Sequence, residues 1–175
     1  MEKSVKSNAI SLGVILGVIL SLVIVLAYTV YQGFYTNWMA GIGISVMIII
    51  FGIVSAIKSR KLLGGFISFK DAFTSYLIPI AIGTIISTIV SILIYVVIDP
   101  DAAAGITEQI IESTVGFMEK FGTPESEIEK AVAKMEEENQ FGLLTQIKGW
   151  FWGMLIYIII GLLACLAVKK KEPLY

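Results

Sequence analysis

The sequence lacks most of the side chains on which enzyme active sites and metal centres depend. It has no histidine, and Cys165 is the one cysteine among 175 residues. We therefore exclude histidine-based acid–base catalysis, a Cys/His metal cluster and an internal disulfide. The sequence also has no Gly-rich phosphate-binding loop after a strand and no paired intramembrane aspartates. From these absences we expect a protein that is not an enzyme and that holds no cofactor and no metal ion.

Charge is scarce as well. Only 15% of the residues are charged and 57% are hydrophobic, which is far too apolar for a water-soluble domain of this size. Four uncharged stretches each reach the roughly 20 apolar residues that cross a bilayer. A helix satisfies all of its own backbone hydrogen bonds in lipid. The sequence therefore predicts four transmembrane helices, at residues 9–31, 38–57, 72–98 and 149–168.

The charges that are present divide by sign between the two sides of these helices. The connection between the third and fourth stretches carries 11 of the 14 acidic residues. Because loops rich in Lys and Arg stay in the cytoplasm, we predict that both termini are cytoplasmic. Nine of the 13 basic residues fall on that side: Lys3, Lys6, Lys58, Arg60, Lys61, Lys70, Lys169, Lys170 and Lys171.

The stretch GGFISFKDAFTSYLIP, residues 64–79, places polar residues directly before the third membrane helix. Ser68 and Asp71 fit a capping box, and Asp71 also suits the positive end of the helix dipole. Lys70 can extend its ammonium group to water and lipid phosphates. Pro79 removes one helix hydrogen bond and predicts a kink. We interpret the stretch as the start of a membrane helix, and a ligand or ion site is the alternative.

Small residues recur on one face of the first and last membrane helices. They are Gly13, Gly17 and Ser21 in the first and Gly153 and Gly161 in the last. Small residues let helices approach closely in lipid. We interpret these faces as packing surfaces within one four-helix bundle. The alternative is a homo-oligomer, or a membrane-protein partner that packs against the first helix.

The third membrane helix also carries a stripe of hydroxyl groups: Thr84, Ser87, Thr88, Ser91 and Tyr95. Such groups commonly bond to the backbone one turn back or to a neighbouring helix. The alternative is a polar pathway through the bilayer. Hydroxyls without an ionisable neighbour are poor groups for coupling transport to an ion. We therefore expect structural hydrogen bonds, with the pathway as the second interpretation.

Residues 99–148 form the one long segment outside the bilayer. Ile106, Ile110, Phe117 and Phe121 recur at helical spacing, and a second amphipathic pattern follows Pro124. We predict an extracytoplasmic acidic αα-hairpin. Its acidic faces would be repelled by anionic lipid, so we expect a cap rather than an arm that lies on the membrane.

Two charge clusters have simple interpretations. Residues 136–138 are three consecutive glutamates, which point about 100° apart on a helix and cannot converge on one ion. We therefore expect a solvated acidic face. The basic connection around Arg60 is explained by membrane topology, and we expect no nucleic-acid partner. Trp38, Trp150 and Trp152 are expected in the outer interface.

Three features together carry a family resemblance. They are the basic connection after the second membrane helix, GGFISFKDAF at 64–73 opening the third, and IDPD at 98–101 closing it. With a helical insert and a fourth span that follow, nearly the whole chain resembles a bacterial membrane family, the domain of unknown function 4199. The resemblance implies four spans in a bacterial inner membrane. It brings no activity and no catalytic residues.

The sequence thus predicts an all-α integral membrane protein with a single membrane domain, residues 1–175. Its main partner is the lipid bilayer. We expect a structural, scaffolding or accessory role. The alternative is a small transporter or channel that uses the hydroxyl stripe and the Pro79 kink. A water-filled cavity bordered by Thr84, Thr88, Ser91 and Tyr95 would favour this alternative, and tight packing of these residues would favour the first role.

Overall fold

The computed structural model describes residues 2–30 and 32–170. In this part of the chain the regular structure is helical, as the apolar runs and amphipathic patterns predict, and the all-α fold is confirmed. The elements are α1 (Lys3–Thr29), the 3₁₀ helix η1 (Gln32–Thr36), α2 (Trp38–Leu62), α3 (Phe69–Ile92), the π-helix η2 (Leu93–Ile98), α4 (Pro100–Lys120), α5 (Glu125–Glu137) and α6 (Leu143–Val168).

Four helices are long and apolar enough to cross a membrane, which confirms the four predicted spans. They are Lys3–Thr29, Trp38–Leu62, Phe69–Ile98 and Leu143–Val168. Each of these helices extends past one end of the uncharged run from which it was predicted, because polar residues can continue a helix beyond the apolar stretch. Long basic side chains at these ends can reach the interface. The predicted end of the first span, Tyr31, lies outside the described residues.

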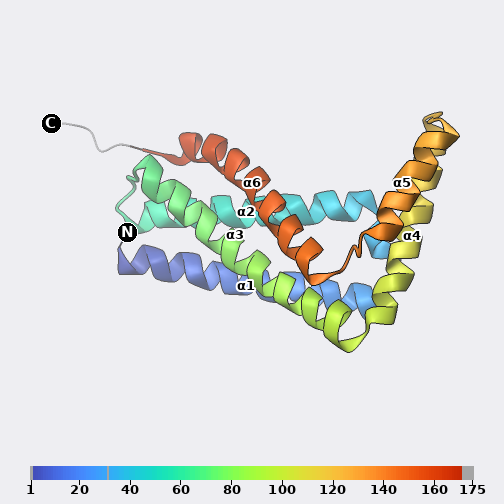
Figure 1. Cartoon of the computed structure of the whole chain (residues 1–175). Helices are drawn as coiled ribbons and strands as arrows, with labels where there is room; N and C mark the ends of the chain where they lie inside the picture. Colours follow the sequence, from blue (N-terminus) through green and yellow to red (C-terminus); the bar gives the residue numbers. More distant parts are fainter. Residues whose placement is uncertain (1, 31, 171–175) are drawn as a thin grey trace.

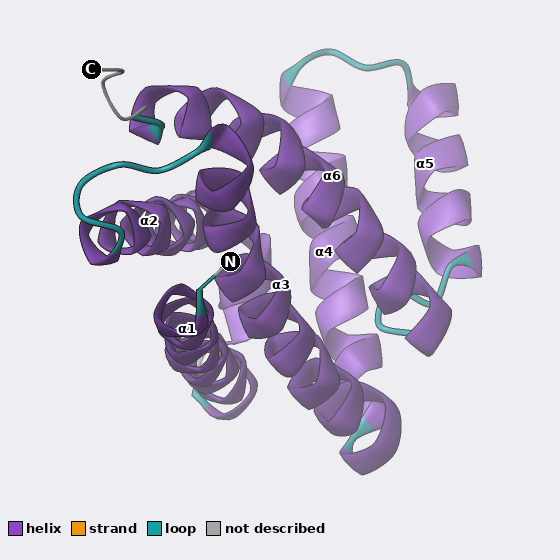
Figure 2. Ribbon diagram, turned by 90° about the vertical axis from the view of Figure 1, so that its left-hand side faces the viewer, coloured by secondary structure: helices purple, strands orange, loops and turns teal. Residues whose placement is uncertain are grey.

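The four spanning helices form one bundle, in which α3 is the central member. It contacts α1, α2 and α6, and α2 contacts each of the other three. Figures 1 and 2 show α1 and α6 on opposite sides of α3. The start of α1, the start of α3 and the end of α6 lie at one end of the bundle, which we call the inner end (Figure 1). The hairpin of α4 and α5 lies at the other, outer end.

The inner end is held together by its connections. The backbone of Ile67, just before α3, pairs with that of Lys170, just after α6, through two hydrogen bonds of 2.9 and 3.1 Å. Arg60 Nη1 donates to the carbonyl oxygen of Val168 at 3.2 Å. A basic group at a helix C-terminus satisfies a free carbonyl and suits the helix dipole. The Arg60 side chain thus ties α2 to α6, and the backbone pair ties the start of α3 to the end of α6.

The polar residues before α3 act within a helix N-terminus. Ser68 is the N-cap of α3: its Oγ accepts from the Asp71 N–H at 3.1 Å and donates to Asp71 Oδ2 at 2.8 Å. Gly64 and Gly65 have φ angles of 74° and 96°, which glycine adopts without strain. α3 then continues through Pro79 to Ile92. The kink expected at Pro79 stays a prediction.

The outer end departs from regular α-helix. The last turns of the third span are a π-helix, η2, and Asp99 then caps α4 by accepting from the Ala102 N–H at 3.0 Å. α4 and α5 lie side by side as a hairpin and run across the end of the bundle rather than along it (Figures 1 and 2). The hairpin begins at Pro100, because Pro is well suited to the first turn of a helix. That it lies on the extracytoplasmic side stays a prediction.

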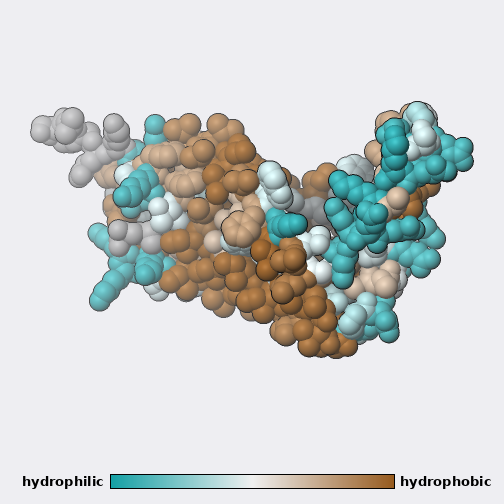
Figure 3. Space-filling view, in the orientation of Figure 1, coloured by the Kyte–Doolittle hydropathy of each residue, from teal (hydrophilic) through white to brown (hydrophobic). Residues whose placement is uncertain are grey.

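The surface agrees with a membrane location for the bundle. Figure 3 shows a broad hydrophobic band across the visible face of the bundle, between a polar inner end and the polar hairpin. Large apolar side chains are exposed along this band, including Leu26, Ile50 and Leu163. A soluble monomer rarely exposes so large an apolar surface. Lipid is the environment that fits the band.

Candidate functional site

A hollow of about 280 Å³ lies between all four spanning helices in the outer half of the bundle. Residues of α1, η1, α2, α3 and α6 line it. Three of them belong to the predicted hydroxyl stripe: Thr84, Ser87 and Thr88. We call this space the outer hollow. The other side chains that line it are apolar or aromatic, so any ligand that fits there has to be largely uncharged.

Two further hollows adjoin it at Thr88. One, of about 270 Å³, is bordered by Ser87, Thr88, Ser91, Ile24 of α1 and Gln146 of α6. The other, also about 270 Å³, lies between α3 and α6 and is lined mainly by isoleucines beside Thr88 and Trp150. Thr88 borders all three spaces. The outer half of the bundle is therefore open around this one residue.

The hydroxyls of the stripe differ in how they are bonded. Thr84 Oγ1 donates to the carbonyl oxygen of Ile80 at 2.7 Å and accepts from Trp150 Nε1 at 2.9 Å. Ser87 Oγ donates to the carbonyl oxygen of Thr84 at 3.0 Å. Thr88 and Ser91 make no side-chain hydrogen bond to any described residue. These two hydroxyls are the ones that remain available to a ligand or to water.

Trp150 was missed as part of this site, because a tryptophan near the end of an apolar run predicts the interface. In the structure α6 begins at Leu143, so Trp150 lies two turns inside the helix and is half-buried. Its indole nitrogen reaches Thr84. Trp152 remains exposed on the outside of α6. The two residues point to opposite sides of α6, about 200° apart, and the rotation of α6 against α3 decides which of them faces the bundle.

Tyr95 lies apart from the rest of the stripe. Its ring packs edge-on against Tyr28 and Tyr35 and lies 4.8 Å from that of Phe141. The hydroxyls of Tyr95 and Tyr35 are 2.9 Å apart, and Tyr28 donates to Asp99 Oδ2 at 2.9 Å. These residues close the outer end of the bundle beneath α4. Burial raises the pKa of Tyr35, so its hydroxyl stays protonated.

Asp99 joins this aromatic cluster to the hairpin. Hydrogen bonds from the Ala102 N–H and from the Tyr28 hydroxyl lower the pKa of Asp99, and the bond from Ala102 has the larger effect. Both groups donate to the carboxylate, and a hydrogen bond to the charged form favours that form. The start of α4 and the end of α1 are therefore linked through one ionised side chain.

The inner half of the bundle is closed. The ring of Tyr76, fully buried, fits between two glycines on either side of it. A Cβ at Gly52 would lie 2.6 Å from Tyr76 Cδ2, and one at Gly161 would lie 2.6 Å from Cδ1. We call this arrangement of Tyr76, Gly52 and Gly161 the inner seal. Buried Leu16 and Ile80 fill the space beside it.

The inner seal was also missed from the sequence, since a tyrosine in a hydrophobic run has no distinctive spacing. Its hydroxyl is buried without a hydrogen-bond partner among the described residues, and so are those of Ser55 and Ser59 on α2. Leaving a buried polar group unbonded costs about 1–3 kcal/mol. The inner half thus combines close packing with unsatisfied hydroxyls.

The small residues of α1 lie at helix contacts within the chain. A Cβ at Gly13 would lie 2.9 Å from the Cβ of Ile82, and one at Gly17 would lie 2.8 Å from the Cβ of Ile86, both on α3. Ser21 continues the series, and its hydroxyl is buried without a partner among the described residues. α1 therefore packs against α3 through the face that we considered for a partner.

The two glycines of α6 do not share one role. Gly161 packs against Tyr76, whereas Gly153 has no atom within 4 Å of an added Cβ among the described residues. A ridge of residues four apart turns by about 40° per step, because the helix repeats every 3.6 residues. Over the eight residues from 153 to 161 this rotation moves Gly153 off the packed face.

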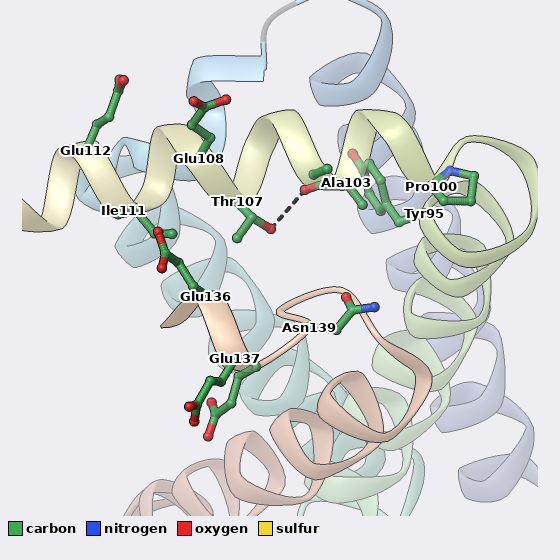
Figure 4. Close-up of a pocket in the computed structure, with 12 residues that line it drawn as sticks. Tyr95, Pro100, Ala103, Thr107, Glu108, Ile111, Glu112, Glu136, Glu137 and Asn139 are labelled. Carbon is green, nitrogen blue, oxygen red and sulfur yellow. Dashed lines mark hydrogen bonds between the residues drawn. The ribbon is translucent and has the colours of Figure 1, made fainter. Parts of the chain in front are cut away.

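A larger hollow, about 690 Å³, is an open cleft between α4 and α5. Four of its glutamates are labelled in Figure 4, where Glu108 and Glu112 point away from Glu137 rather than towards a common centre. Within residues 2–30 and 32–170, no group of three or more His, Cys, Asp or Glu side chains is placed to hold a metal ion. The cleft has the geometry of a solvated acidic surface.

Four apolar helices, three of them packed against a central one, with polar groups at both ends, define a multi-pass α-helical membrane protein. The chain belongs to a family of proteins of unknown function (DUF4199), whose sequence profile matches residues 11–170. No match to the chain was found among curated proteins or among solved structures.

Proposed function

We propose that the protein is a non-enzymatic structural, scaffolding or accessory protein of the bacterial cytoplasmic membrane, with both termini in the cytoplasm. The observation that carries this proposal is the inner seal. Tyr76 is wedged between two helices at contacts too close for any further side chain. A route through the bundle would have to pass this point. The basic residues at the inner end support the orientation, because Lys and Arg favour the cytoplasmic side.

The uncharged interior adds support. The four predicted spans contain no Asp, Glu, Lys, Arg or His. An ionisable group inside the membrane is the usual mark of an ion or proton pathway. A bundle without one is better suited to holding a fixed shape beside another membrane protein, or beside a second copy of itself. Such a partner would pack against the outside of the bundle, in the lipid-exposed band.

One observation favours a second function, a small transporter or channel. Thr88 borders three adjoining hollows, and its hydroxyl and that of Ser91 have no partner among the described residues. An uncharged solute could be held there by hydroxyl groups and apolar contacts. Passage would then require the inner seal to open. In this conformation the hollows around Thr88 end on the outer side of Tyr76.

Two experiments separate these functions. For the first, the tagged chain is captured from gently solubilised membranes, with an unrelated four-span protein at equal expression as the control. We expect one of two results. A membrane protein co-purifies in stoichiometric amount with this chain and not with the control, or the chain purifies as a homo-oligomer. A monomer without any enriched protein would contradict a scaffolding or accessory role.

For the second, the purified chain is placed in vesicles and the entry of glycerol, an uncharged solute, is measured. The accessory role predicts entry no faster than in protein-free vesicles. The transporter alternative predicts faster entry that Thr88→Leu removes. Ile42→Leu is the matched control, since Ile42 is exposed on the outside of α2. Faster entry with this dependence on Thr88 would overturn the accessory role.

A further inference from the structure

Two large aromatic side chains are exposed near the end of α4, outside the bundle. Phe117 is 62% and Phe121 74% exposed, and their ring centroids lie 4.6 Å apart. The spanning helices expose apolar side chains because lipid surrounds them. Between residues 100 and 139, all of them described, Phe117 and Phe121 are the two large apolar side chains that are exposed. Leaving these two adjacent phenylalanines open to water would be costly, since burying one such side chain contributes about 1.5–3 kcal/mol.

The pair lies on the face of α4 that packs on the bundle. At about 100° per residue, Phe117 is about 20° and Phe121 about 60° around the helix from Ile106. Ile106 is fully buried, and Ile110, one turn later, packs against the same cluster. The first half of α4 thus uses this face to cover the outer end of the bundle. The second half of α4 extends beyond the edge of the bundle (Figure 1), and by the same rotation it carries the phenylalanine pair on this face.

The acidic residues of α4 lie on the opposite face. Measured in the same way from Ile106, Glu108, Glu112 and Glu119 are about 200°, 240° and 220° around the helix. From their charge alone we expected anionic lipid to repel the hairpin. Helix geometry therefore separates the two surfaces: the phenylalanines share the side of α4 that packs on the bundle, and the carboxylates lie on the opposite side. This is the arrangement of a helix that lies in a membrane interface.

The level of α4 along the bundle also fits. α4 contacts η1, which ends at Thr36, directly before α2. The first residue of α2 is Trp38, whose side chain is 73% exposed. Exposed tryptophans at the ends of spanning helices mark the headgroup layer of a bilayer. The part of α4 that contacts the bundle therefore lies near the level of the headgroups, and α4 runs from there across the end of the bundle (Figure 1).

We propose that α4 docks on the surface of the surrounding bilayer through Phe117 and Phe121, in the leaflet at the outer end of the bundle. The partner is phospholipid, bound by burial of the two rings among headgroups and upper acyl chains. The acidic face stays in water, so binding needs no anionic lipid. The interface continues the contact that α4 makes with the bundle. It does not depend on the function proposed above.

The test measures the depth of a spin label in vesicles of zwitterionic phosphatidylcholine. All variants carry Cys165→Ala, so that the introduced thiol is the only one. Phe121→Cys and Thr114→Cys place labels on the docking face, and the second keeps both phenylalanines. Glu112→Cys is the matched control on the opposite face of the same helix. Accessibility is read from collisions with oxygen, which is enriched in lipid, and with a water-soluble nickel chelate.

We expect the labels at 114 and 121 to collide several-fold less with the nickel chelate, and more with oxygen, than the label at 112. Adding Phe117→Ser and Phe121→Ser to the 114 variant should raise its nickel collisions towards those at 112. Equal nickel accessibility on the two faces would overturn the proposal. Protection of positions 114 and 121 from both reagents would also overturn it, because that result indicates a protein contact, such as a second copy of the chain.

Discussion

The inner seal makes a sharp prediction for two glycines of the same helix. Gly161→Ala places a Cβ against the ring of Tyr76, 2.6 Å from Cδ1 and 3.2 Å from Cζ. Gly153→Ala places the same group where no described atom lies within 4 Å. Real Cβ atoms essentially never approach another heavy atom to less than 3.0 Å. Gly52 limits the retreat of the Tyr76 ring on its other side, because a Cβ added there would lie only 2.6 Å from Cδ2.

The expected magnitude follows from this geometry. Forcing one extra carbon into a packed core costs about 1–3 kcal/mol. Replacing glycine by alanine within a helix returns about 0.5–1 kcal/mol, but that gain is common to both substitutions and cancels in their comparison. We therefore expect Gly161→Ala to be less stable than Gly153→Ala by about 1–3 kcal/mol.

The assay is reversible unfolding in mild detergent by increasing fractions of a denaturing one, followed by tryptophan fluorescence. Tyr76→Leu, made alone and with Gly161→Ala, completes a double-mutant cycle, in which residues in contact couple by about 0.5–3 kcal/mol. The smaller leucine should tolerate the alanine, so the double variant should be more stable than the sum of the single effects. Equal stability of Gly161→Ala and Gly153→Ala would refute the inner seal as the closed point of the bundle.

Other predictions concern the two ends of the molecule. A reporter fused to the C-terminus should be active only in its cytoplasmic form, and a periplasmic signal would contradict the topology. Ser68→Ala should lower stability by about 0.5–2 kcal/mol through the lost N-cap, while Lys70→Arg should change little. If Lys70→Arg removes a cellular phenotype at normal protein level, Lys70 belongs to a functional site. The pKa of Asp99 is lowered from 3.8 in the folded chain. Its contribution to stability is therefore present above the ordinary pKa and should be lost as pH falls through the lowered value. Unfolding curves of Asp99→Asn should lack this acid-dependent loss. Backbone amides at 105–139 should exchange hydrogen faster in detergent than amides in the middle of any span, and equal protection would show that the hairpin is locked to the bundle.

The spans and the hairpin could be predicted because their signals are local. An uncharged run long enough to cross a bilayer has few other stable structures. The cap at Ser68 is also local, since donor and acceptor lie three residues apart. The ends of the helices were harder to predict. α6 begins at Leu143, six residues before the predicted start, because the polar first turns of the helix do not differ in composition from a loop.

The site depends on contacts between helices, which the sequence does not encode by spacing. The residues of the predicted hydroxyl stripe all lie on the third span, but the structure divides them among different neighbours. Thr84 is bonded to Trp150, Thr88 borders the hollows and Tyr95 belongs to the aromatic cluster at the outer end. Which neighbour each hydroxyl meets depends on the rotation of α3 against α1 and α6. A single helix pattern contains no information on that rotation.

The separation of an open outer half from a closed inner half follows from the placement of small residues. At the inner seal, Gly52 and Gly161 let α2 and α6 approach the ring of Tyr76 from both sides. At the level of Thr88 the bulky indole of Trp150 lies between α6 and α3 and bonds to Thr84. A large side chain there holds the helices apart, and a glycine pair brings them together. Exchanging these properties, with a smaller residue at 150 or larger ones at 52 and 161, should therefore move the closed point along the bundle.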